Sequence, residues 1–161
     1  MPLPAKPPSE SATDMVEVVL PNDTNPMGFM LGGAVMHLID LAGAIAAFRH
    51  ARALMVTAAV DGLEFLNPIK VGDFIILKSR VTAAFTTSLE VEVKVYSEGA
   101  LSGKRQMTSR AYLTFVTLDR DGRRAEVPPL DVQTDEERKL QEAARVRRAE
   151  HLARRSRAIE T

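Results

Sequence analysis

The chain has 161 residues and a mass of 17.6 kDa, which predicts one domain with a short extension. Basic and acidic residues both number 21, so no net charge draws the protein to nucleic acid or to an anionic membrane. The lack of cysteine excludes disulfides and thiolate chemistry. The three histidines, His37, His50 and His151, are too dispersed for a local metal cluster, so no metal is expected.

Residues 1–13 are rich in proline and contain no apolar run, which predicts a flexible leader rather than a signal peptide or membrane anchor. The expected location is therefore the cytoplasm. Residues 15–20 alternate well enough to predict a first strand, which ends at Pro21.

A nearly continuous apolar stretch follows and predicts a helix from about Gly32 to His50. A helix that is apolar on nearly every side must be covered all round. We therefore expect a curved sheet against one side and a second copy of the chain against the other. His37 and Asp40 interrupt the stretch, which we expect to be too short to span a bilayer.

The chain is then β-rich up to about residue 118. Four segments predict strands by their alternation and their flanking turn residues: 55–65, 74–81, 89–95 and 106–118. Gly62 marks an expected bulge in the first of them. One strand, one long helix and then four antiparallel strands predict an α+β domain over residues 14–130.

Residues 131–161 predict a helical extension. Thr134 and Glu137 form a capping box, and the arginine-rich sequence after them offers only a thin apolar stripe. We expect a largely solvated helix that docks on one edge of the domain. Acidic residues interrupt the arginines and no aromatic residues lie among them, so nucleic acid is not an expected partner.

Asp40 is the most informative residue, because it is a lone carboxylate inside the apolar helix. Burying an ionised carboxylate is costly unless it is paired or hydrogen-bonded, so Asp40 is either a structural partner or a working group. Gly32 and Gly33 favour a working group. Their amides at the helix start can bind an anion or a carbonyl oxygen that gains negative charge, although glycines there also permit close packing alone.

Asp40 lies seven residues beyond Gly33, which places it about 10 Å further along the helix axis, pointing away from its own helix start. Asn25 offers an amide donor and acceptor from the loop before the helix. Antiparallel helices across a two-fold axis would bring Asp40 of one subunit to Asn25 of the other. The spacing therefore predicts a composite site in a homodimer.

The helix start resembles the signature of the hotdog-fold acyl-CoA thioesterases at Asn25, Gly28, Gly32, Gly33 and Asp40. Later segments agree with that family in order and spacing: 56–58, 61, 65–73, 87–88 and 112–122. The resemblance covers roughly residues 15–130. It implies a hotdog fold, in which a sheet wraps one helix and dimerises, often into a hexameric trimer of dimers. It also implies hydrolysis of fatty acyl-CoA to free acid and CoA, with CoA as part of the substrate and no separate cofactor.

The resemblance implies that Asn25 and Asp40 are catalytic and act from opposite subunits, and that the amides of Gly32 and Gly33 polarise the thioester carbonyl. Asp40 would act as general base on a water, or as a nucleophile that forms an anhydride. Asn25 would orient that water or donate to the carbonyl. Each donor to the oxyanion is worth roughly 3 kcal/mol in a dry site.

The resemblance also places Thr57 and the turn of Thr86, Thr87 and Ser88 near the substrate and CoA channel. Phe85 and Thr86 stand where the family usually has a glycine and a basic residue. The family's usual contacts with CoA phosphates are therefore not implied at this turn.

Two alternatives stay open. Residues 23–28 resemble the Asp-x-Asn-Pro-x-His motif of hotdog enoyl-CoA hydratases, but Gly28 stands where the histidine base would be. The other alternative is a non-catalytic acyl-CoA sensor, as some hotdog domains are. Such a sensor would normally need an attached DNA-binding domain, and neither the leader nor the C-terminal helix supplies one.

Overall fold

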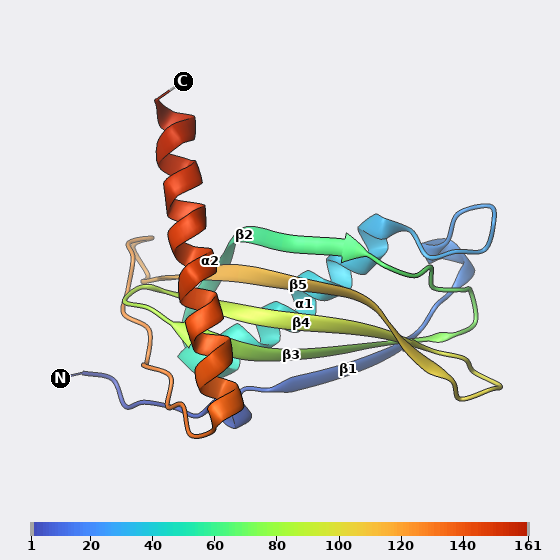
Figure 1. Ribbon diagram of the computed structural model, residues 1–161, viewed down its shortest axis with the longest axis horizontal. Coiled ribbons are helices and arrows are strands. Elements are labelled where there is room, and N and C mark those ends of the chain that lie inside the picture. The colour runs from blue at the N-terminus through green and yellow to red at the C-terminus, as the bar shows by residue number, and fades with distance from the viewer. Residues whose placement is uncertain (1, 161) are drawn as a thin grey trace.

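The computed structural model describes residues 2–160, so Met1 of the leader and Thr161 of the extension lie outside the described residues. An antiparallel sheet of five strands, in the order β1-β3-β4-β5-β2, wraps one long helix, α1 (Figure 1). The strands are β1 (Thr13–Val18), β2 (Leu54–Phe65), β3 (Phe74–Ala84), β4 (Ser88–Glu98) and β5 (Arg105–Leu118), and the helices are α1 (Gly32–Ala51) and α2 (Asp135–Ile159). The α+β prediction is confirmed, and a sheet wrapped around one helix is the hotdog arrangement that the resemblance implied.

The predicted strands are all present, with small differences in their bounds. The first strand begins at Thr13 rather than at Met15, and β3 continues to Ala84. The expected irregularity at Gly62 is confirmed, because the pairing of β2 with β5 shifts between Asp61 and Glu64. Gly62 has a φ of 63°, which a residue with a side chain adopts only under strain.

The core lies between α1 and the inner face of the sheet. Successive residues of a strand point to opposite faces, so alternate residues of β4 and β5 reach α1, and Val91, Val93 and Leu113 among them are fully buried. A Cβ added to Gly43 in the middle of α1 would lie 3.3 Å from the ring of Phe115. This glycine therefore permits the close approach of helix and sheet.

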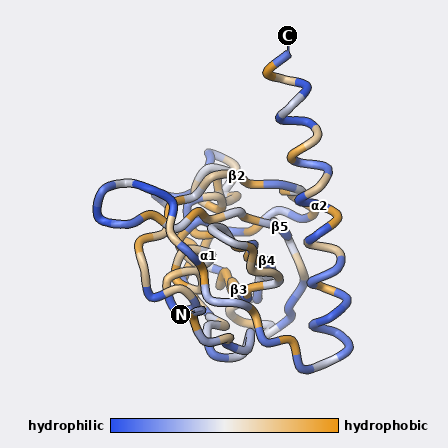
Figure 2. Tube along the Cα trace, turned by 90° about the vertical axis from the view of Figure 1, so that its left-hand side faces the viewer, coloured by the Kyte–Doolittle hydropathy of each residue, from blue (hydrophilic) through white to orange (hydrophobic). Residues whose placement is uncertain are grey.

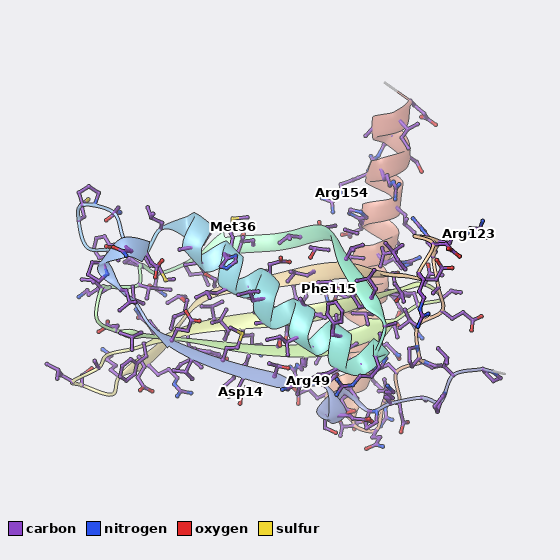
Figure 3. The ribbon with its side chains drawn as sticks, turned by 180° about the vertical axis from the view of Figure 1, so that it is seen from behind. Asp14, Met36, Arg49, Phe115, Arg123 and Arg154 are labelled. Atoms are coloured by element: carbon purple, nitrogen blue, oxygen red, sulfur yellow. The ribbon has the colours of Figure 1, made fainter. Side chains whose placement is uncertain are left out.

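The side of α1 that faces away from the sheet is uncovered. Its apolar side chains are exposed, namely Met36, Leu41, Ile45 and Phe48. The edge strand β2 also exposes apolar side chains, namely Leu54, Val56 and Val60. In the single chain the sheet covers one side of α1, as predicted, and the other side is the apolar surface on which a second copy of the chain was expected. Figure 3 views α1 from this uncovered side.

The prediction that α1 is too short to span a bilayer is wrong. The helix has 20 residues and is apolar enough to cross a membrane by length and composition. Its inner side nevertheless packs into the core of the domain, as the buried Leu38, Ile39 and Ala42 demonstrate. α1 is therefore built as the central helix of a folded domain.

The expected flexible leader is attached to the domain. The backbone amide of Lys6 donates to the carbonyl of Pro129 (3.0 Å), and its ammonium group donates to the carbonyl of His50 at the end of α1 (2.8 Å). Pro8 and Ser11 are buried. These contacts hold the leader against the C-terminal end of α1, so it is not free as the proline content suggested.

The capping box of α2 is confirmed, because the amide of Glu137 donates to Oγ1 of Thr134 at 3.1 Å. The predicted docking on one edge is wrong, however. α2 crosses the outer face of the sheet, on the side opposite α1, and its C-terminal end projects past β2 (Figures 1 and 2). Arg147 of α2 makes two hydrogen bonds to Glu90 of β4, at 2.8 and 3.0 Å.

Candidate active site

Asp40 lies halfway along α1 and is hydrogen-bonded to the edge strand. Oγ1 of Thr57 in β2 donates to Oδ1 of Asp40 at 2.7 Å. No cation among residues 2–160 forms an ion pair with this carboxylate, and its side chain is only partly buried in the single chain. Asp40 is therefore not a structural member of a buried ion pair. Its other oxygen, Oδ2, can accept a proton from water.

The Asn25 side chain closes the loop before α1. Its Oδ1 accepts hydrogen bonds from the amides of Met27 (2.9 Å) and Phe29 (3.1 Å). The acceptor of the side chain is thereby used, so Asn25 can act at a ligand only as a donor through its NH2 group. Gly28, where a hydratase would carry its histidine base, has a φ of 82°, which disfavours a side chain at this position.

The N-terminus of α1 has free amide donors. Leu31, the N-cap, provides no side-chain cap, and the first backbone bonds of the helix are donated by Ala34 and Val35. Within the described chain the amides of Gly32 and Gly33 donate to no acceptor. A Cβ at Gly33 would meet nothing within 4 Å, so a ligand can approach this helix start closely.

A mainly apolar groove of about 360 Å³ lies beside Gly32. Its lining comes from the loop before α1, the start of α1, the end of β2, the loop after β2 and one residue of β5: Met30, Gly32, Val35, Phe65, Leu66, Asn67, Pro68, Ile69 and Ser109. The groove thus adjoins the predicted carbonyl site, whereas Asp40 does not line it.

The structure brings Thr57 to Asp40 but does not bring Asn25 to Asp40 within the chain. Asn25 lies in the loop before α1, and its hydrogen bonds to residues 2–160 stay within that loop, whereas Asp40 bonds to β2. The role of Thr57 as the partner of Asp40 was missed by sequence reasoning. The only available signal was a hydroxyl residue near the start of the strand that follows the helix.

The turn of Thr86, Thr87 and Ser88 lies between β3 and β4 and contacts α2. Nη1 of Arg148 donates to Oγ of Ser88 at 3.0 Å, and its guanidinium group lies 4.2 Å from the centre of the Phe85 ring. The C-terminal helix therefore brings a cation to the turn whose own sequence has none. Sequence reasoning missed Arg148, because nothing in the helix pattern indicates which arginine faces the sheet.

No group of three potential ligand side chains that could hold a metal ion occurs between residues 2 and 160. The titratable groups with shifted pKa values lie away from Asp40. Burial lowers the pKa of His50, and burial together with the charge of Glu92 raises the pKa of Tyr112. His50 lies at the end of α1, and Tyr112 lies under α2, so these shifts concern the packing of the domain.

Residues 27–103 match the family model of the thioesterase superfamily. The chain is 40% identical, over 92% of its length, to the uncharacterized acyl-CoA thioester hydrolase YkhA of Bacillus subtilis, of which it covers 86%. It is 34% identical to the human cytosolic acyl coenzyme A thioester hydrolase over 91% of its length, but spans only 39% of that larger protein. The chain belongs to the thioesterase superfamily, which confirms the predicted family.

Solved structures agree with this assignment. The acyl-CoA hydrolase of Staphylococcus aureus, in complex with butyryl coenzyme A, coenzyme A and coenzyme A disulfide, superposes with a TM-score of 0.90 at 37% identity, covering 98% of this chain and 96% of that chain. A hexameric acyl-CoA thioesterase in its apo form superposes with a TM-score of 0.90 at 38% identity, covering 94% of this chain and 97% of that chain. The hotdog fold is thereby confirmed.

Proposed function

We propose that this protein is an acyl-CoA thioester hydrolase, which cleaves fatty acyl-CoA to the free acid and CoA. Relatives with this name match most of the chain at 33–40% identity, which confirms the predicted enzyme class. The observation in the structure that best supports the proposed chemistry is the hydrogen bond from Thr57 to Asp40, because it orients a carboxylate that has no cationic partner.

In the proposed reaction Asp40 removes a proton from a water molecule, and the resulting hydroxide attacks the thioester carbon. The carbonyl oxygen gains the negative charge and accepts hydrogen bonds from the amides of Gly32 and Gly33. Collapse of the intermediate breaks the carbon–sulfur bond, and the CoA thiolate takes the proton from Asp40. Asn25 donates through its NH2 group, either to the carbonyl or to the attacking water.

Variants of the S. aureus enzyme support the choice of residues. Three of its solved structures carry alanine in place of an asparagine, an aspartate and a threonine. These three residues have the same spacing along their chain as Asn25, Asp40 and Thr57 have here. Thr57 is then a positioning residue that acts through Asp40.

The assembly we propose is a homodimer with a two-fold axis, which associates further as a trimer of dimers. The exposed apolar side of α1 and the edge of β2 supply a surface that a second copy would cover. Antiparallel α1 helices would carry Asp40 of one subunit toward Asn25 of the other. Two of the solved thioesterases that resemble this chain are hexameric, which supports self-association.

The proposed path of CoA runs past Thr57 to the turn of Thr86, Thr87 and Ser88, where Arg148 provides a cation for a phosphate group. CoA belongs to the substrate, and the proposed reaction uses no other cofactor. We place the enzyme in the cytoplasm, consistent with the name of the human relative.

The test is release of CoA thiol from a panel of acyl-CoA substrates of increasing chain length. We expect Asp40→Ala to lower kcat by at least about a hundredfold, because general-base catalysis is worth about 10²–10⁴-fold. Asp14→Ala is the matched control, since Asp14 is an exposed β1 residue paired with Lys78 at 3.6 Å. An Asp40→Ala enzyme with the turnover of the control would refute the assignment.

A further inference from the structure

Ser109 of β5 carries a buried hydroxyl group with no partner. The residue is 1% exposed, and no group among residues 2–160 forms a hydrogen bond with its Oγ. Alternation along β5 places Ser109 on the same face as Ala111 and Leu113, which pack toward α1. A buried hydroxyl without a partner is destabilising, so its presence here needs an explanation.

The surroundings of Ser109 connect it to the predicted carbonyl site. Ser109 lines the apolar groove that adjoins Gly32. Phe65 is its partner on the neighbouring strand, and the Phe65 ring lies 3.3 Å from the position of a Cβ on Gly32. The groove therefore has free amide donors at one end, and its mainly apolar wall carries two polar side chains: Asn67, whose NH2 group donates to the carbonyl of Met107 at 2.9 Å, and Ser109, whose hydroxyl is unpaired.

We infer that this groove holds the acyl chain and that Ser109 selects chains that carry an oxygen atom, that is, hydroxyacyl or oxoacyl groups. The inference rests on the proposed function, because it requires the thioester carbonyl to lie at the amides of Gly32 and Gly33. A volume of about 360 Å³ accommodates on the order of a dozen water-sized groups. The groove thus suits a short or medium acyl chain.

The physical basis of this selection is the contrast between Ser109 and its neighbours. A plain alkyl chain fills the space between Val35, Ile69 and Phe65 but leaves the Ser109 hydroxyl unpaired. A chain oxygen at the right carbon gives that hydroxyl a partner and is itself satisfied. Phe65 is 54% exposed, so its ring can move to admit the chain to Ser109.

The experiment compares hexanoyl-CoA with a series of hexanoyl-CoA derivatives that carry a hydroxyl group at each successive carbon beyond the α-carbon. For the wild-type enzyme we expect one position to raise kcat/KM about tenfold over the unsubstituted chain, the effect of one hydrogen bond in an apolar site. Ser109→Ala should abolish this preference, so that the kcat/KM values of the variant for the hydroxylated and the unsubstituted chains become equal. Its melting temperature should not fall.

Ser79→Ala is the matched control, because Ser79 is also a buried serine of the sheet but its hydroxyl donates to the carbonyl of Ala42 at 2.7 Å. It should lower the melting temperature and keep the preference for the oxygenated chain. A wild type without such a preference, or a Ser109→Ala enzyme that retains it, overturns the inference but leaves the proposed function intact as long as hexanoyl-CoA is hydrolysed. A failure to hydrolyse any acyl-CoA overturns both.

Discussion

Each face of the sheet is covered by a helix, but the inner face is apolar and the outer face is charged. On the inner face Val91 and Val93 of β4 pack against α1, and on the outer face Glu90 and Glu92 of the same strand lie beneath α2. Glu90 is 6% exposed and Glu92 is 2% exposed, so the carboxylates are almost as deeply buried as the valines. A charged face of a strand is therefore not necessarily a solvated face.

The difference follows from what each helix offers. α1 contributes apolar side chains and makes no ion pair with the sheet among residues 2–160. α2 contributes Arg147, which bonds to Glu90 and lies 3.5 Å from the centre of the Tyr112 ring, while Arg80 joins Glu92 to Glu136 at 3.2 Å each. Close packing of apolar side chains therefore attaches α1 to the inner face, and pairing of charges attaches α2 to the outer face.

The largest expected effect is on the inner face. Phe115→Ala would leave a cavity opposite Gly43, whose lack of a side chain lets the helix approach the sheet closely. We expect the free energy of unfolding to fall by about 3–5 kcal/mol. Urea denaturation followed by circular dichroism measures this loss. Leu152→Ala in α2 is the control, because Leu152 is 45% exposed, and a similar loss in both variants would remove the contrast between the faces.

The next effect is on the outer face. Arg147→Met would leave Glu90 buried without its two hydrogen bonds from Arg147, and we expect a loss of about 2–3 kcal/mol, because Arg147 is itself partly exposed. Adding Glu90→Gln should restore most of this stability, since no unpaired charge then remains. Urea denaturation again measures the free energy of unfolding. A double variant that is no more stable than Arg147→Met would show that charge pairing does not stabilise the contact of α2 with this face.

A smaller effect is expected at His50, which closes the inner core beside the leader. Its ring is fully buried, Nε2 lies 2.8 Å from the carbonyl of Pro128, and Nδ1 has no partner among residues 2–160. Burial lowers its pKa below the usual 6.5, although the Pro128 carbonyl opposes this, and among the nearby charges Lys6 lowers the pKa and Glu10 raises it.

Because the unfolded chain binds a proton that the folded chain excludes, the contribution of His50 to stability is complete above about pH 6.5 and declines as the pH falls below that value. His50→Gln keeps a donor for the Pro128 carbonyl but cannot titrate. We expect a smaller difference in unfolding free energy between about pH 7.5 and about pH 5 for this variant than for the wild type. Equal pH dependence in both proteins would contradict the assignment.

The sequence predicted the elements well where local signals act. The alternation in residues 89–95 and the pair Thr134 and Glu137 determine structure through neighbouring residues, and both predictions are confirmed. The predicted docking of α2 was wrong because Glu90 and Glu92 follow the alternation of a solvent-exposed strand face. The burial of Glu90 depends on Arg147, which is distant in the sequence and bonds to it. Proline content likewise gave no sign that Lys6 would bond to His50 and Pro129.

The candidate site was predictable in its residues but not in its contacts. Asp40, Gly32 and Gly33 were identifiable because a carboxylate and a glycine pair are unusual in an apolar helix. The hydrogen bond from Thr57 to Asp40 was not predictable, because it joins a helix to an edge strand whose register the sequence does not reveal. Ser109 gave no signal at all, because only the folded sheet leaves its hydroxyl unpaired.

The most direct test of a site shared between subunits is to mix two inactive variants. Asp40→Ala and Asn25→Ala are each expected to have little activity, but a mixed dimer contains one site with both native residues. After unfolding and refolding an equal mixture, random pairing should restore about a quarter of wild-type thiol release. Activity that stays at the level of the separate variants, in a mixture shown to contain mixed dimers, would contradict the shared site.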